Sequence, residues 1–394
     1  MREVVIVEAG RTAVGRKNGV LAHTHPHQLL GSVQAEVLHR AGLDPAAVGQ
    51  VIGGCPDAVG AQAGNVVRMA WLTAGLPVTV PGATVDSACG SSQHAFNLAV
   101  SLVASGAEDV VLACGVENMS MVPLGASGVD GAKAGHGKPV TRGYFDHHEL
   151  TSQFEGAERI ATKYGITRSD TDELGLESQA RARRALDQGR FDTQIVPIDA
   201  ISVDADGNRL DATTPFVVDE VPRDSSLEAL VALKPVARED GIHTAGSSSQ
   251  IADGAAAVLL MSAERAAELG LRVRARVLDT CLVGCDPVLM LEGPIPATER
   301  LLDRTGLTMA DIDVVEINEA FASVVLAWAQ TLKADMDVVN PNGGAIALGH
   351  PLGATGCILV TKAVHELDRA DGEHALVTMC CGGGLGTGTL LQRV

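Results

Sequence analysis

The sequence predicts an α/β fold built from two similar halves, and two observations lead to this prediction. Short β-branched and aliphatic runs alternate along the chain with segments of helical periodicity. Residues 42–48 resemble residues 306–312, and residues 108–112 resemble residues 373–377, in the same order and at offsets of 264 and 265 residues. Coincidence is the alternative explanation for two short matches, but the nearly equal offsets favour an internal duplication.

Each half is interpreted as parallel strands joined by crossover helices. The segment from Ser91 to Ala104 is apolar on nearly every face, which predicts a helix buried between two sheets. Layers of helix, sheet, buried helices, sheet and helix would satisfy both halves. The strand-like runs are Val4–Val7, Gln50–Ile52, Val110–Leu112 and Val314–Ile317, and helical periodicity covers Leu29–Ala41.

The chain divides into two halves and an insertion. We expect the first half at residues 1–120 and the second at residues 265–394. Residues 121–250 are polar and have no counterpart in the second half, and residues 251–264 return to the first half. Such an insertion is typical of a loop or lid domain that covers a site. It holds a glycine-containing stretch at 125–137, a helical pattern at 169–188 and a turn at 204–208.

Composition argues against several classes of function. The 394 residues include 30 Lys and Arg against 48 Asp and Glu, a net charge of −18. This charge repels nucleic-acid phosphates, and 3% aromatic residues provide few stacking platforms, so no nucleic-acid partner is expected. No apolar run approaches the roughly 18 residues that span a bilayer, and the start of the chain is too short and acidic for a signal peptide. We therefore expect no membrane association and a cytoplasmic location.

Cysteine and histidine spacing predicts neither disulfides nor a metal site. The eight cysteines are scattered in a way that neither a disulfide framework nor a paired CxxC zinc site would produce. His23, His25 and His27 form a short tract, but no second cluster with ligand spacing accompanies it. No GxGxxG follows the first strand, so a dinucleotide cofactor is not indicated.

Cys89 is the first candidate for chemistry. Residues 84–92 (TVDSACGSS) place it between the end of a strand and the start of the predicted buried helix. Backbone N–H groups and the helix dipole stabilise a thiolate at such a position, so we expect a lowered pKa and a nucleophilic role. A small, buried, unreactive cysteine is the alternative.

His350 is the second candidate. It lies at the tip of a glycine-spaced loop, residues 340–356 (NPNGGAIALGHPLGATG), that leads into a helix. An imidazole with little side-chain bulk around it suits a general base or an oxyanion donor. A solvent-exposed loop histidine is the alternative.

Two further strand ends carry polar or reactive residues. Residues 379–388 (MCCGGGLGTG) contain three successive glycines, whose N–H groups can line a pocket beside a proton-exchanging thiol. Because Cys380 and Cys381 are adjacent, only one of them can point into a site. Asn318 and Glu319 end another strand, where helix capping by Asn318 is the alternative to a catalytic role.

Together these segments resemble the thiolase family, and the resemblance covers essentially the whole chain. It implies an acyltransferase with a duplicated five-layer αβαβα thiolase fold and an inserted loop domain. It also implies acyl-CoA and CoA as substrates, no resident cofactor, a homodimer or homotetramer, and possible association with other β-oxidation enzymes. The matching segments are 86–91 (DSACGS), 244–249 (TAGSSS), 253–257 (DGAAA), 318–322 (NEAFA), 342–351 (NGGAIALGHP) and 380–384 (CCGGG).

The resemblance further implies a role for each reacting group. Cys89 would attack the 3-keto carbon of a 3-ketoacyl-CoA and form a covalent acyl-enzyme. His350, which could also activate Cys89, would stabilise the departing acetyl-CoA enolate together with a water held by Asn318. Cys380, rather than Cys381, would protonate that carbanion and then deprotonate the incoming CoA.

Binding roles follow from the same resemblance. The backbone N–H groups of Cys89 and Gly382 would form a second oxyanion hole. CoA is polyanionic and the chain is acidic, so a local cation is needed, and Arg223 resembles the family arginine near the nucleotide end of CoA. Ser249 resembles the serine beside the pantetheine.

Residues 153–158 (QFEGAE) bear on the substrate. Relatives that prefer acetoacetyl-CoA tend to carry a stretch similar to MGTAE there, so Phe154 favours a degradative thiolase for fatty acyl or bulky groups, including steroid side chains. The alternative is a biosynthetic acetyl-CoA acetyltransferase, because one site runs both directions. A decarboxylating ketoacyl synthase-like enzyme is a second alternative, but such an enzyme would lack a second catalytic cysteine at the position of Cys380. An inactive acyl-CoA carrier is a third, but a carrier would not need Cys89, His350 and Cys380.

Overall fold

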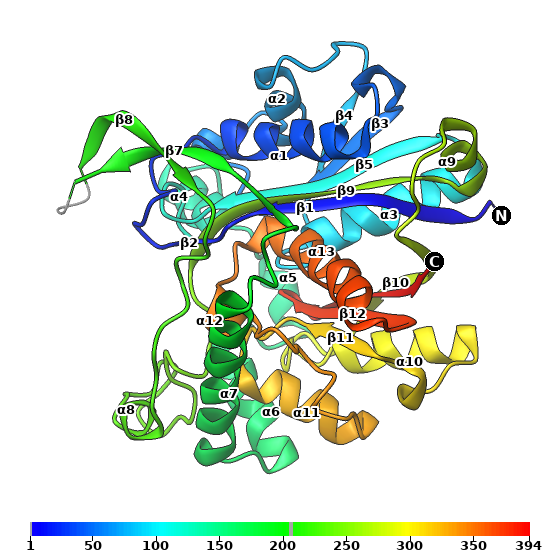
Figure 1. Cartoon of the computed structure of the whole chain (residues 1–394). Helices are drawn as coiled ribbons and strands as arrows, with labels where there is room; N and C mark the ends of the chain where they lie inside the picture. Colours follow the sequence, from blue (N-terminus) through cyan, green and yellow to red (C-terminus); the bar gives the residue numbers. More distant parts are fainter. Residues whose placement is uncertain (1, 205–207) are drawn as a thin grey trace.

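The computed structural model describes residues 2–204 and 208–394, and two α/β halves pack around a pair of central helices (Figure 1). Apart from two strands described only in the first half and one short helix described only in the second, the strand and helix order of the first half recurs in the second, which confirms the predicted duplication. The first half contains β1 (Val4–Thr12), β2 (Gly15–Arg16), α1 (Pro26–Ala41), β3 (Gln50–Gly54), α2 (Val66–Thr73), β4 (Gly82–Val85), α3 (Ser91–Ser105), β5 (Val110–Asn118) and β9 (Ala252–Ser262). The second half follows α9 (Ala263–Leu269) and contains β10 (Ala275–Gly284), α10 (Pro294–Thr305), β11 (Val314–Ile317), α11 (Ala322–Leu332), α12 (Ala345–Leu348), α13 (Leu352–Ala370), β12 (His374–Cys381) and β13 (Leu385–Arg393).

The insertion separates β5 from β9. Its β7 and β8 form a two-stranded sheet that projects from the body of the molecule (Figure 1), and residues 205–207 of the turn predicted between them lie outside the described part. In the described ranges, none of the helices is both long and apolar enough to cross a bilayer. The insertion contains α4 (Ala126–Lys133), α5 (Arg142–Phe145), α6 (Gln153–Tyr164), α7 (Arg168–Asp187), β6 (Ile195–Val196), β7 (Ile198–Val203), β8 (Arg209–Phe216) and α8 (Leu227–Val231).

The two predicted sheets are hydrogen-bonded to each other. The strand order is β11-β12-β13-β10-β1-β9-β5-β3-β4, and the halves meet where β1 pairs with β10. That pairing covers only two positions, Val5 with Arg276 and Ile6 with Ala275. Because the junction is so short, the two arms of the sheet lie as separate layers with α3 and α13 between them, while α1 and α2 cover one outer face and α10 and α11 the other (Figure 1).

The prediction of parallel strands was wrong for part of each half. β3 pairs in parallel with β4 and β5, and β11 with β12, but β9 runs antiparallel to β1 and β5. β13 likewise runs antiparallel to β10 and β12. The physical reason is the connection: β12 and β13 are joined by a short hairpin at Gly382–Gly384, and such a turn joins only antiparallel neighbours.

The more deeply buried central helix is α13, not α3. Residues 352–367 of α13 are all buried, including Lys362, whose ammonium group lies 2.6 Å from Glu316. The helix predicted to be buried all round, α3, leaves Leu98 36% exposed. The sequence pattern did not predict this burial of α13, because Lys362 interrupts its apolar positions and its ion-pair partner, Glu316, is distant in sequence.

Small residues bring the N-termini of α3 and α13 together. A Cβ at Gly356 of α13 would collide with the backbone of Gln93 in α3, so only glycine allows the two helices to approach this closely. The segments that precede these helices carry Cys89 and His350. The helix crossing therefore sets the distance between the two candidate catalytic groups.

Candidate active site

A constrained turn holds Cys89 between β4 and α3. The preceding Ala88 has φ of +50°, a left-handed conformation that costs a residue with a Cβ roughly 1–2 kcal/mol. Two hydrogen bonds stabilise it: the Ala88 N–H donates to the Asp86 carboxylate at 2.9 Å, and the Ser91 hydroxyl donates to the Ala88 carbonyl at 2.6 Å. The position of the Cys89 side chain is thus fixed by its own loop.

The Cys89 thiol is protonated in the resting site. Burial raises its pKa to about 11, although the backbone N–H groups of Gly382 and of Cys89 itself act to lower it. The expectation of a lowered pKa was therefore wrong. Cys89 is only 9% exposed, and the loss of hydration of the thiolate outweighs the stabilisation offered by the helix N-terminus. Nucleophilic attack by Cys89 requires a nearby proton acceptor.

His350 has the protonation state of a proton acceptor. Its Nδ1 lies 2.6 Å from the Thr355 hydroxyl, and that hydroxyl donates its single hydrogen to the Pro351 carbonyl at 2.9 Å. Nδ1 must therefore carry the ring hydrogen, which leaves a lone pair on Nε2. Burial lowers the pKa of His350 to about 4, so the ring is neutral at pH 7 and Nε2 can accept a proton.

Asn318 lies beside this imidazole. Its Nδ2 is 3.4 Å from His350 Nε2, and its Oδ1 is buried without a hydrogen-bond partner in the described part of the chain. An unpartnered amide oxygen at this depth indicates a position for a water or a substrate group. Asn318 does not cap a helix, because α11 begins at Ala322 after Phe321 in the N-cap position, so the capping alternative was wrong.

Glu319 anchors the loop that carries His350. Its carboxylate accepts hydrogen bonds from the Asn340 side chain at 2.9 Å, from the Ser178 hydroxyl of α7 at 2.6 Å and from the Ile346 N–H at 3.1 Å. A Cβ at Gly344 would collide with this carboxylate. The single buried side chain of Glu319 thereby ties the end of β11 to the His350 loop and to the insertion.

The two adjacent cysteines face opposite sides of β12, as predicted. Cys380 packs with Phe321 and Leu291, whereas Cys381 lies against Gly90 at the start of α3. Burial raises the pKa of both thiols well above the usual range, and the nearby Cys89 raises both further. Cys380 is therefore a protonated thiol on the same side of the strand as the pocket.

One pocket brings three of the predicted site residues, Cys89, His350 and Cys380, together with Ser249. Asn318 and Gly382 are not among the lining residues. The Asn318 side chain contacts His350, and the Gly382 N–H contacts the Cys89 sulfur. Arg223 is not part of the pocket; it is exposed and donates to the Ala245 carbonyl at 3.0 Å, next to the segment that carries Ser249. The described residues that line the pocket are Cys89, Met119, Leu124, Gln153, Phe154, Ser248, Ser249, Gln250, Ile251, Leu291, Ala320, Phe321, His350, Leu352 and Cys380.

Sequence reasoning missed Thr355 and Ser248. Thr355 follows His350 by five residues and lies in the first turn of α13. A hydroxyl at this spacing could have been recognised as a hydrogen-bond partner for the imidazole. Ser248 is buried, and its hydroxyl has no partner among the described residues. No signal marked it, because burial of a serine in a Gly/Ser-rich segment depends on the tertiary structure.

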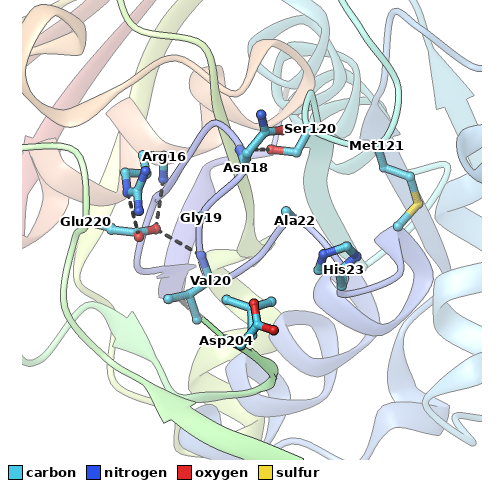
Figure 2. A pocket seen from close by; sticks show the side chains of 11 residues that line it. Arg16, Asn18, Gly19, Val20, Ala22, His23, Ser120, Met121, Asp204 and Glu220 are labelled. Carbon is cyan, nitrogen blue, oxygen red and sulfur yellow. Dashed lines mark hydrogen bonds and ion pairs between the residues drawn. The ribbon is translucent and has the colours of Figure 1, made fainter. Parts of the chain in front are cut away.

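A second hollow lies at the edge of the insertion (Figure 2). Arg16 and Glu220 lie together in its lining and form an ion pair at 2.9 Å, and the Asn18 N–H donates to the Ser120 hydroxyl at 2.7 Å. None of the predicted site residues lines it. Within the part of the chain that the structure describes, no group of His, Cys, Asp and Glu is arranged to hold a metal ion.

Comparison with known proteins identifies relatives over the full length. The family model for the thiolase N-terminal domain matches residues 4–264, and the model for the thiolase C-terminal domain matches residues 271–393. A steroid 3-ketoacyl-CoA thiolase of Mycobacterium tuberculosis is 46% identical, over 100% of this chain and 95% of that protein. An acetyl-CoA acetyltransferase of Pseudomonas aeruginosa is 42% identical, over 100% of both chains.

A solved structure agrees with these matches. The crystal structure of the Bacillus anthracis acetyl-CoA acetyltransferase superimposes with a TM-score of 0.90 at 35% sequence identity. The match covers 100% of this chain and 99% of the other.

Proposed function

Because this chain belongs to the thiolase family of acyltransferases, we propose that it cleaves 3-ketoacyl-CoA with CoA to give acetyl-CoA and a shortened acyl-CoA. The observation that carries the proposal is the single pocket lined by Cys89, His350 and Cys380. Two thiols and one imidazole, all neutral at rest, provide the nucleophile, its base and a separate acid for a carbon–carbon bond cleavage.

In the first half-reaction, Cys89 attacks the C3 carbonyl while His350 Nε2 takes its proton. The C2–C3 bond then breaks, and its electron pair remains on C2 as the enolate of acetyl-CoA. The protonated Nε2 and a water on Asn318 stabilise the enolate oxygen. The Cys380 thiol donates its proton to C2, which releases acetyl-CoA and leaves an acyl thioester on Cys89.

In the second half-reaction, the Cys380 thiolate takes the proton of an incoming CoA thiol. The CoA sulfur attacks the acyl carbon, the Cys89 sulfur leaves and takes back the proton held on His350 Nε2, and the shortened acyl-CoA is released. The N–H groups of Cys89 and Gly382, which already act on the Cys89 sulfur, support a role in stabilising the oxyanion of this thioester exchange. Arg223 and Ser249 are proposed to bind the nucleotide end and the pantetheine of CoA.

The degradative direction with a bulky acyl group is the preferred interpretation. The pocket wall is mainly apolar, and Phe154 contacts Phe321 with ring centroids 5.4 Å apart. The cavity is about 80 Å³, smaller than the roughly 300 Å³ or more of typical ligand pockets, so a bulky group requires the lid to move. Leu124 and Phe154 on the lid are 45% and 37% exposed, which leaves them room to turn outward.

Several broader features remain proposals. Residues 1–120 and 265–394 are taken as the two thiolase halves, and residues 121–250 as a lid domain. The homodimer or homotetramer, the association with other β-oxidation enzymes and the cytoplasmic location are proposed from the sequence and the family resemblance.

Mass spectrometry of the acyl-enzyme tests the proposed function. The protein is mixed with 3-ketoacyl-CoA esters of increasing bulk, without free CoA, and digested. We expect an acyl group on Cys89 and release of one acetyl-CoA per acylated site. Labelling elsewhere, or none with any ester, would contradict the proposal. Acylation by acetoacetyl-CoA alone would favour the biosynthetic acetyltransferase instead.

A second variant separates the roles of the two thiols. In Cys380→Ser, a simple acyl-CoA thioester should still acylate Cys89, because that exchange needs no carbon acid. Condensation of two acetyl units should be lost. Full condensation activity in this variant would refute the acid/base role of Cys380.

A further inference from the structure

Ser248 has an unpartnered hydroxyl group and lies in the lining of the pocket that contains Cys89, His350 and Cys380. The residue is 7% exposed, and its Oγ has no hydrogen-bond partner among the described residues. Its backbone is fixed on both sides: the Ala322 N–H donates to the Ser247 carbonyl at 2.9 Å, and the Ser249 N–H donates to the Ala320 carbonyl at 3.0 Å. The unpaired state therefore belongs to a well-anchored segment.

The neighbouring serine behaves differently. The Ser247 hydroxyl accepts a hydrogen bond from the Thr244 N–H at 3.0 Å, so it has an internal structural role. The Ser248 hydroxyl has no such internal hydrogen bond among the described residues. Leaving a buried polar group unpaired costs about 1–3 kcal/mol of folding free energy. A methyl group at this position would complete the apolar wall formed by Phe321, Leu291 and Phe154 without that cost.

The lining also limits the ligand that could pair with this hydroxyl. Among the described residues of the pocket, none is Lys or Arg, and the one histidine, His350, is neutral at pH 7. A carboxylate on the acyl group would be buried without a counter-charge, which is strongly unfavourable. A purely hydrocarbon acyl group would leave the Ser248 hydroxyl unpaired. A neutral oxygen atom satisfies both conditions.

We propose that Ser248 is a specificity residue that hydrogen-bonds to a hydroxyl or ketone oxygen of the acyl group, beyond the reacting C3 carbonyl. This inference rests on the proposed thiolysis at Cys89 and defines its substrate class as oxygen-bearing 3-ketoacyl-CoA esters. A pocket that hydrogen-bonds a substrate oxygen rejects the analogue lacking it, because the pocket group then loses its partner.

The test compares 3-ketoacyl-CoA esters of one chain length, either unsubstituted or with one hydroxyl or keto group at successive carbons from C5 onward. The wild-type protein should cleave at least one oxygenated ester with a kcat/KM about 10-fold or more above that of the unsubstituted ester, equivalent to about 1.4 kcal/mol. In Ser248→Ala this preference should disappear, and kcat/KM for the unsubstituted ester should stay the same or rise.

Ser249→Ala is the matched control, with the same chemical change at the next residue of the pocket lining. It should lower kcat/KM for every ester by the same factor, because a pantetheine contact is common to all of them. Thermal melting of Ser248→Ala should equal or exceed that of the wild type, since the hydroxyl has no structural partner.

The possible results separate this inference from the proposed function. Thiolysis of all esters with no preference, or a uniform loss in Ser248→Ala, would overturn the role of Ser248 and leave the thiolase activity intact. A lower melting temperature with an unchanged preference would make Ser248 structural and overturn the role as well. Absence of cleavage of every ester by the wild type would instead contradict the proposed function.

Discussion

The two halves of the molecule share one framework and differ most at a single connection. In the second half, β12 and β13 are joined by the three residues Gly382–Gly384. In the first half, the equivalent connection from β5 to β9 contains residues 119–251. The connection in the first copy thus supplies part of the pocket lining, and the second copy supplies a tight hairpin that follows Cys380 and places the Gly382 N–H beside Cys89. Duplication provided two similar scaffolds, and their connections made one site.

Glu117 and Cys381 are equivalent residues of the two halves, and they too differ in chemistry while keeping the same position in the fold. They are 264 residues apart, and each lies at the N-terminus of a central helix from the other half. The Gly353 N–H of α13 donates to the Glu117 carboxyl group at 3.0 Å, and Cys381 lies against Gly90, which precedes α3. Equivalent positions therefore support the helices, while the neighbouring Cys380 faces the pocket.

The largest expected effect separates the two sides of β12. Cys380→Ala should lower kcat for thiolysis by about 10³-fold, because the general acid is removed. Cys381→Ala is the matched control on the opposite face. It should change kcat by less than about 5-fold while lowering the melting temperature, since it opens a small cavity beside α3. Steady-state kinetics and thermal melting measure both; equal losses of activity would show that the two faces are not distinct.

The next effect concerns the anchor of the His350 loop. Glu319→Gln replaces a carboxylate that accepts three hydrogen bonds, so we expect a loss of about 2–3 kcal/mol in unfolding free energy and a fall of about 10-fold or more in kcat. Cys55 lies 264 residues earlier, at the equivalent position of the first half. Cys55→Ala should cost about 1 kcal/mol and leave kcat nearly unchanged. Chemical denaturation and steady-state kinetics compare the two variants. An equal fall of kcat in Cys55→Ala and Glu319→Gln would contradict the special role of Glu319.

A smaller effect is expected from the hydrogen bond that sets the His350 tautomer. Thr355→Val removes the partner of Nδ1 at 2.6 Å, so the ring loses its preference for a free Nε2. We expect kcat to fall about 10-fold with little change in KM, because substrate binding does not involve Thr355. An unchanged kcat would contradict the assignment of Nε2 as the proton acceptor. Thr355→Ser, which retains the hydroxyl, should restore most of the activity.

The last effect concerns stability and not turnover: the unfolding free energy depends on pH. Burial raises the pKa of Glu117 to about 8 from its ordinary value of 4.5. Folding therefore takes up a proton between pH 4.5 and 8, and the unfolding free energy falls as the pH rises through this window. Glu117→Gln does not titrate, so its melting temperature relative to the wild type should increase between pH 5 and pH 9. A difference that stays constant over this range would show that Glu117 is not protonated in the folded chain.

Much of the framework could be predicted because it depends on local sequence. The strand at Val314–Ile317 has the bounds that the sequence indicated, and the helices predicted at 91–104 and 169–188 match α3 and α7 to within one residue at each end. Glycine-rich loops marked the segments around Cys89, His350 and Cys380, which the fold brings to one pocket.

The features that escaped prediction depend on distant parts of the chain. The antiparallel direction of β9 is set by pairing with β1 and β5, and the burial of Lys362 depends on Glu316. The raised pKa of Cys89 depends on how completely the two halves exclude water from it. None of these is encoded within a short window of sequence.

Short-range cross-linking tests most directly whether the two halves contribute to one pocket. A bis-alkylating thiol reagent with a short spacer is added at high pH, where buried thiols ionise, and the digested protein is analysed by mass spectrometry. The structure predicts a cross-link between Cys89 and Cys380, its absence in Cys380→Ala, and protection by prior acylation. Separate alkylation of Cys89 and Cys380 without any bridge would contradict the shared pocket.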